Sequence, residues 1–139
     1  MRGLKLACAA ALLAGVLGAQ MIMPSSGNCK ETPYEEEGGY QSSYACFYPK
    51  QTILQTYLNY RKEFTEKYPD DNYYEALRSK LEVGKDYNDT IGKDYLWINY
   101  KWSGKNELNV EMEMSGGGDI ATFTHNNSGT QLRVIRWFQ

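Results

Sequence analysis

The chain has 139 residues, of which 42% are hydrophobic and 14% aromatic, and its formal net charge is −2 at pH 7. This length corresponds to one domain with a single core. The mild acidity argues against a nucleic-acid partner, because domains that bind nucleic acids usually carry a basic stripe. One histidine and three cysteines do not provide the ligand set of a typical zinc site, so we expect no metal and no cofactor.

The first 19 residues have the pattern of a secretory signal peptide. A basic start at Met1–Lys5 is followed by the apolar run Leu6–Leu17 and by small residues up to Ala19. The apolar run is too short to cross a bilayer comfortably. We therefore expect residues 1–19 to be removed. The mature protein is then secreted or periplasmic, without stable insertion into a membrane.

Residues 20–49 are predicted to form an irregular segment that one disulfide holds in place. Cys8 is lost with the signal peptide, so Cys29 and Cys46 remain. An even pair of cysteines in a small exported domain is most simply a disulfide. Neither cysteine belongs to a Cys-x-x-Cys motif, which argues against a redox pair or a metal pair. Within this segment, Gln41–Phe47 is expected to form a short strand or a helical turn.

Two helices are predicted between residues 50 and 82. In residues 50–68, apolar side chains recur at helical spacing, at Ile53, Leu54, Tyr57, Leu58, Phe64 and Tyr68. Pro69 ends this helix, because the residue before a proline avoids the α region. Asn72 and Glu75 have the spacing of a capping box, which predicts a second helix that extends to about Glu82.

The next stretch, 84–95, is predicted to be a loop. Asp86, Asn88, Asp89 and Asp94 give it the composition of a calcium-binding loop. It lacks the EF-hand pattern, because no glycine stands at the sixth place and Trp97 occupies the position of the bidentate glutamate. We therefore assign no calcium site to it.

Four strands of an antiparallel meander are predicted over residues 95–102, 108–114, 120–126 and 130–138. Leu108, Val110 and Met112 alternate with polar residues, as in a strand with one buried face. Pairing Trp102 with Leu108 places the apolar rows of the first two strands on the same side. A slip of one residue would bury carboxylates, so this register is well specified.

The element order predicts an α+β domain over residues 50–139, with two helices packed on one face of the four-stranded meander. This order is similar to that of cystatin-like and NTF2-like domains, in which a curved sheet cups a helix. The resemblance concerns the order of elements alone, and a shared fold does not imply a shared function.

The opposite face of the sheet is the candidate site. It is expected to carry Tyr95, Trp97, Ile135 and Trp137 beside the charged residues Lys101, Glu111, Glu113 and Arg133. Aromatic residues among mixed charges are typical of surfaces that recognise other proteins. In the alternative arrangement, a helix or the N-terminal segment covers this face.

No catalytic residue is assigned. His125 stands alone beside a turn, and no Gly-x-Ser-x-Gly elbow occurs in the chain. Glu111 and Glu113 share a strand face, a pattern more typical of a solvated surface than of a glycosidase pair. Whether the protein is an enzyme is left open, with the balance against it.

These features predict an exported soluble binding protein that acts by protein–protein contact on another exported protein, as an inhibitor or an immunity-type protein. The alternative is a small-ligand carrier or a small enzyme with a pocket between helices and sheet. Such a pocket would be lined by Tyr100, Trp102, Met112, Met114 and Phe123. An open apolar cavity favours the alternative. A filled core, with Trp97 and Trp137 both exposed, favours contact.

Overall fold

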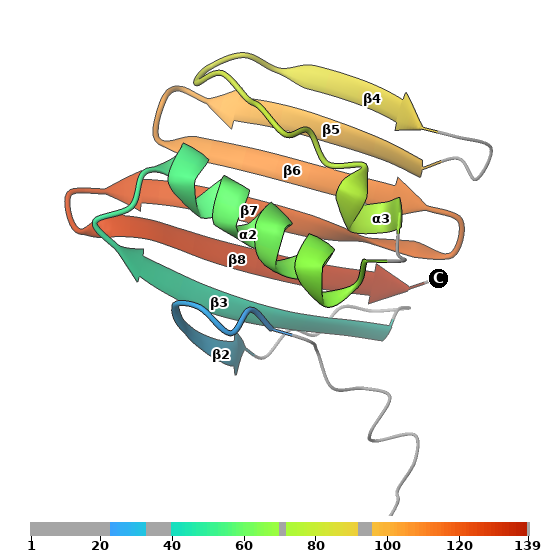
Figure 1. Cartoon of the computed structure of the whole chain (residues 1–139), viewed down its shortest axis with the longest axis horizontal. Helices are drawn as coiled ribbons and strands as arrows, with labels where there is room; N and C mark the ends of the chain where they lie inside the picture. The colour runs from blue at the N-terminus through green and yellow to red at the C-terminus, as the bar shows by residue number, and fades with distance from the viewer. Residues whose placement is uncertain (1–22, 33–39, 70–71, 92–95, 139) are drawn as a thin grey trace, which may run out of the picture.

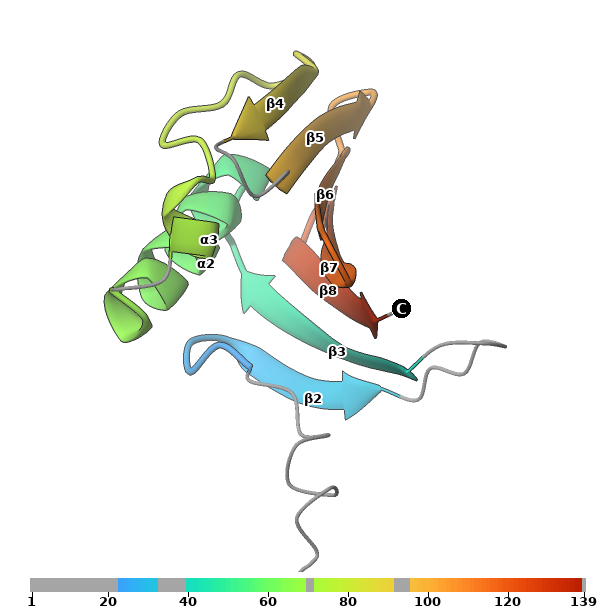
Figure 2. The same cartoon turned by 90° about the vertical axis from the view of Figure 1, so that its right-hand side faces the viewer.

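The computed structural model describes residues 23–32, 40–69, 72–91 and 96–138. Seven strands form one antiparallel sheet, and helix α2 (Ile53–Lys67) lies across one face of it (Figures 1 and 2). The predicted signal peptide, residues 1–19, lies outside the described residues.

The chain builds the sheet in two passes. Five consecutive strands form a meander, and two earlier strands join it at the free side of β8, so that the spatial order is β2-β3-β8-β7-β6-β5-β4. Along the chain, α2 follows β3 and precedes β4. In space, it packs against β7 and β8. The strands are β2 (Asn28–Thr32), β3 (Tyr40–Pro49), β4 (Tyr87–Ile91), β5 (Leu96–Ser103), β6 (Glu107–Met114), β7 (Gly117–Asn126) and β8 (Gly129–Phe138).

The predicted fold class is wrong. Instead of two helices on a four-stranded meander, the described residues form one long helix and a seven-stranded antiparallel sheet. The second predicted helix is reduced to α3 (Asn72–Glu75), which is a single turn. The likeness to cystatin-like and NTF2-like element orders therefore does not hold, because strands precede the helix and β4 stands where a loop was expected.

The first two strands place the N-terminal segment in the same sheet as the C-terminal strands. β3 pairs with β8 along its whole length, from Tyr40 opposite Phe138 to Pro49 opposite Gly129. Tyr44, Cys46 and Tyr48 alternate along β3 with their side chains buried. The predicted disulfide is confirmed: Cys29 of β2 and Cys46 of β3 are directly opposite each other and bonded.

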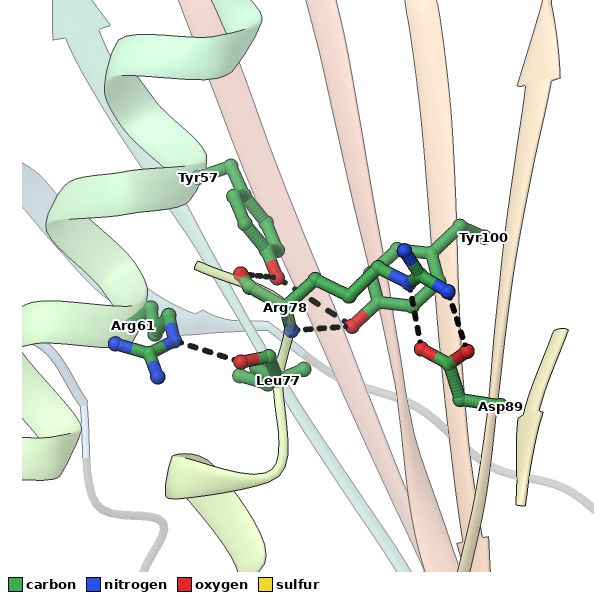
Figure 3. A network of polar contacts seen from close by, with 6 residues as sticks. All are labelled: Tyr57, Arg61, Leu77, Arg78, Asp89 and Tyr100. Atoms are coloured by element: carbon green, nitrogen blue, oxygen red, sulfur yellow. Dashed lines mark hydrogen bonds and ion pairs between the residues drawn. The ribbon is translucent and has the colours of Figure 1, made fainter. Parts of the chain in front are cut away.

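Residues 77 and 78 leave the helical path because side chains from elsewhere bind their backbone (Figure 3). The Arg78 amide donates to the hydroxyl of Tyr100 (2.8 Å), and the Arg78 carbonyl accepts from the hydroxyl of Tyr57 (2.7 Å). The Leu77 carbonyl accepts from Nε of Arg61 (2.7 Å). A longer α3 would need these same backbone groups for its own hydrogen bonds.

Alternation along the strands divides the sheet into an inner face under α2 and an outer face. The predicted register is confirmed, since Trp102 pairs with Leu108 and Ile98 with Met112. The inner residues of the meander are buried, and Phe123 is fully inaccessible beneath the ring of Tyr57, with ring centroids 6.0 Å apart. The core is therefore the layer between α2 and the inner face.

Helix α2 begins with a capping box. The side chain of Thr52 accepts from the amide of Gln55 (3.1 Å), and the side chain of Gln55 accepts from the amide of Thr52 (2.9 Å). This reciprocal pair satisfies two donors that the first turn leaves without helical partners. Pro49 ends β3, and Lys50, where the predicted helix was to begin, instead turns the chain with a φ of 63°.

Candidate recognition face

The outer face carries the predicted contact residues that the structure describes. Trp97 is 40% exposed, and Lys101 and Arg133 are exposed as well. Glu111, Glu113, Ile135 and Trp137 are half-buried on the same face. Tyr95 lies outside the described residues. Seven of the eight predicted residues therefore share one surface.

Trp97 and Trp137 belong to one row that crosses the strands. Cross-strand pairing joins Thr90 to Trp97, Trp97 to Glu113, Glu113 to Gly118, and Gly118 to Trp137. The two tryptophans are three strands apart, which corresponds to about 14 Å between their backbones. Both rings therefore lie within reach of a single small protrusion of another protein.

Gly118 leaves the row without a side chain between Glu113 and Trp137. A Cβ at this position would collide with the carbonyl oxygen of Met112 in the neighbouring strand. The close approach of β6 and β7 thus requires glycine. As a result, no side chain covers the backbone at Gly118, next to Trp137 in the row.

A polar hollow of about 700 Å³ opens on the β4, β5 and β6 side of the sheet, and its lining on β5 begins at Asn99, two residues beyond Trp97. Lys101 and Glu111, both predicted contact residues, line it together with Asn88, Asn99 and Asn109. These five side chains offer donors, acceptors and both signs of charge. The hollow places hydrogen-bonding groups on the same sheet face as the exposed ring of Trp97.

The second row of the outer face contains a residue that the sequence analysis left out. Pairing places Ile120 between Glu111 and Ile135, so that two isoleucines form a half-buried apolar strip next to the tryptophan row. Its position follows from Phe123 facing inward, because side chains alternate along a strand. The alternation would therefore have been enough to place Ile120 on the outer face from the sequence alone.

No described helix covers the outer face, because α2 packs on the opposite side (Figure 2). The lead-in 23–27 also runs on the helix side. Ser25 and Ser26 donate hydrogen bonds to the carboxylate of Glu63, a residue of α2. Burial alone would raise the pKa of Glu63, but these four hydrogen bonds outweigh it and lower the pKa.

The inner face holds a charged pair that the sequence analysis missed. Nε of Arg136 donates to Oδ1 of Asp119 (2.8 Å), and one Nη donates to Oδ2 (3.0 Å) and to the hydroxyl of Tyr74 (3.2 Å). The hydrogen bonds to Asp119 raise the pKa of Arg136. Burial, followed by the nearby hydroxyl of Tyr74 and the charge of Asp119, raises the pKa of Tyr44 well above its usual value.

Four of the five residues proposed for an interior pocket form part of the packed core instead. Tyr100, Trp102, Met112 and Phe123 are at most 7% exposed, whereas Met114 is 37% exposed and lies at the end of the sheet. His125 lies at the opposite end, where Nδ1 is 3.1 Å from the hydroxyl oxygen of Thr130. That hydroxyl donates to the carbonyl of Gln51. This arrangement is a structural link between β8 and the chain before α2.

Comparison with known proteins gives no relative: neither a family model, nor a curated protein, nor a solved structure matches the chain. Within the described ranges, no helix is long and apolar enough to span a bilayer. Among the same residues, no group of three or more His, Cys, Asp or Glu side chains is placed to hold a metal ion. The site is therefore interpreted from its own geometry.

Proposed function

We propose that this protein is an exported binding protein that acts by contact, through the outer face of its sheet, on another exported protein, as an inhibitor or an immunity-type protein. The observation that carries the proposal is the row that places Trp97 and Trp137 on the one face that α2 leaves uncovered. Tryptophan dominates binding energy at many interfaces, because it buries a large area with few torsions to order.

The surroundings of Trp97 favour a partner that presents an apolar side chain beside a basic one. Glu113 is the direct cross-strand neighbour of Trp97, and Glu111 follows two positions along the same strand. An arginine or a lysine over the indole ring would gain a cation–π contact and an ion pair with Glu113 at the same time. Lys101 and Arg133 would meet acidic groups at the rim.

Export is supported by two features. Residues 1–19 have the composition of a signal peptide. The Cys29–Cys46 bond joins β2 to β3, and disulfides persist mainly in oxidising compartments. A partner in the same compartment is the simplest target for a protein without an assigned catalytic residue.

The proposal is tested by site-specific photo-crosslinking in the exported fraction of the source organism. A photoreactive amino acid at position 97 or 137 is expected to capture one dominant protein. The same group at position 83 is the matched control, since Val83 is 50% exposed and follows Leu81 and Glu82, which line a hollow with Leu54 and Leu58 of α2. The captured protein is then purified, and its affinity is measured by calorimetry.

Trp97→Ala and Trp137→Ala are expected to weaken that affinity at least about tenfold, as truncation of a hot-spot aromatic residue does. Val83→Ala should leave it unchanged. The same protein crosslinked equally from positions 97 and 83, or an affinity that neither tryptophan variant changes, would overturn the assignment of this face.

A further inference from the structure

A second cleft lies at the end of the sheet where β6 turns into β7. It has a volume of about 490 Å³, in the size range of small-molecule sites. Its floor is the glycine turn Gly116–Gly118 with the pair Asp119 and Arg136. Its walls are mainly apolar and aromatic, formed by Tyr68, Tyr74, Met114, Trp137 and Phe138.

Arg136 is the charged group of this cleft that is open to a ligand. Its side chain is 26% exposed, whereas the side chain of Asp119 is only 2% exposed. Nε and one Nη are engaged by Asp119 and Tyr74. Guanidinium has a further Nη with two N–H donors, which these hydrogen bonds do not use. The carboxylate is therefore enclosed, while part of the guanidinium opens to the cleft.

The charge balance favours a neutral acceptor on the ligand. The carboxylate of Asp119 already compensates the charge of Arg136. A carboxylate on the ligand would therefore add a second negative charge beside Asp119 in a largely apolar cleft. Burying such a charge is costly, whereas a carbonyl oxygen can accept from Nη at little cost.

The aromatic wall favours a planar ligand. The rings of Phe64 and Tyr74 stack at 4.8 Å with an interplanar angle of 20°, and Tyr68 and Tyr74 stack at 6.3 Å and 23°. Tyr68 and Tyr74 of this stack line the cleft, Tyr68 half-buried and Tyr74 buried. A flat ring placed against Tyr68 gains the offset stacking that aromatic pairs prefer. Exposed Met114 and Phe138 complete an apolar rim.

We propose that this cleft binds a small planar aromatic molecule that carries one carbonyl-type acceptor, with the carbonyl on Arg136 and the ring against the aromatic wall. This site is independent of the contact function proposed for the outer face. Only Trp137 and Gly118 belong to both regions, so variants of the other residues separate the two roles.

The test uses the full chain and the polarity-sensitive naphthyl ketone prodan, which is neutral and has one carbonyl group. Titration is expected to shift prodan emission to shorter wavelength and to saturate at one probe per chain. Anilinonaphthalene sulfonate, an anion with a similar ring system, is expected to bind more weakly. In NMR spectra, the amides of Gly116–Gly118 and Nε of Arg136 should shift with prodan.

Two variants remove different parts of the site. The double substitution Asp119→Asn with Arg136→Gln keeps the site polar without leaving a buried charge, and it should weaken prodan binding at least about tenfold. Phe138→Ala removes one part of the rim and should weaken binding about threefold to tenfold. Val83→Ala and Trp97→Ala should leave prodan binding unchanged.

Three results would overturn the proposal: no saturable binding of prodan, tighter binding of the sulfonate, or full affinity in both cleft variants. Phe138→Ala provides the test if the double variant does not fold. Because Trp97→Ala affects only the contact face and Phe138→Ala only the cleft, failure of one proposal is distinguishable from failure of the other.

Discussion

The two faces of the sheet use the same strands for opposite purposes. On β5, Ile98 and Tyr100 are buried beneath α2, while Trp97 and Lys101, each one residue away, are exposed. The inner face gains its free energy from packing against a single helix. The outer face leaves two indole rings partly in contact with water, since Trp97 is 40% exposed and Trp137 is half-buried. Under the proposed function, a partner would cover this remaining surface.

This difference shows that burial, rather than residue type, separates the structural aromatic residues from the candidate contact residues. Tyr57, Tyr100 and Phe123 interlock edge to face in the core. Trp97 has no such described ring partner, and Glu113 and Thr90 are its neighbours across the strands. Substitutions on the two faces should therefore separate stability from binding.

The largest contrast is expected between adjacent residues of β7. Phe123→Ala should lower the free energy of unfolding by about 3–5 kcal/mol, because it opens a cavity beneath Tyr57 and Tyr60. Thr124→Ala, on the exposed face of the same strand, should change it by less than about 0.5 kcal/mol. Urea denaturation measures both, and equal losses would contradict the division into faces.

A second contrast compares the two arginine–carboxylate pairs. Arg136→Met should lower the free energy of unfolding by about 3 kcal/mol, because it leaves the buried carboxylate of Asp119 without its cation. Asp119→Asn added to this variant should restore part of the loss. Arg78→Met should cost less, since its pair with Asp89 is more exposed. Thermal unfolding ranks the variants, and a greater loss for Arg78→Met would reverse this interpretation.

A smaller effect is expected where tyrosine hydroxyls bind the backbone. Tyr100→Phe removes the acceptor of the Arg78 amide and should lower the free energy of unfolding by about 1–2 kcal/mol. Tyr87→Phe is the matched control, because it keeps the ring that lies 3.9 Å from the guanidinium carbon of Arg78. If both variants unfold alike, the hydroxyl does not hold the chain at residue 78.

The smallest effect concerns the lead-in and depends on pH. Hydrogen bonds from Ser25 and Ser26 lower the pKa of Glu63, so the ionised form is favoured in the folded state. Their stabilisation is present above the unfolded pKa of about 4.3 and is lost as pH falls through the lower folded pKa. Glu63→Gln should therefore be less stable than the unmodified protein at pH 7, and the difference should disappear in acid. A constant difference at all pH values would contradict this linkage.

The sequence predicted what depends on neighbours along the chain. Alternation in residues 107–114 and the position of Trp102 were sufficient for the meander and its register. Pairing of the cysteines followed from their number. The eight contact residues followed from the same alternation, and the seven that the structure describes lie on one face.

The sequence could not predict what depends on distant contacts. The sequence left Gln41–Phe47 open between a short strand and a helical turn, because Tyr44, Cys46 and Tyr48 become an inner row only when β8 pairs beside them. The end of α3 is set by Tyr57 and Tyr100, which lie 21 and 22 residues from Arg78. The predicted strand 120–126 leaves out Asp119, whereas the strand 130–138 contains Arg136, and only the β7–β8 register places the two residues opposite each other.

The central claim is that the outer face is built for contact and not for folding. It is tested most directly by measuring partner affinity and the free energy of unfolding together for Trp97→Ala. The protein captured by crosslinking from position 97 serves as the ligand. We predict that affinity falls at least about tenfold while the free energy of unfolding changes by less than about 1 kcal/mol. A large loss of stability with unchanged affinity would show that Trp97 supports the fold, and would contradict the claim.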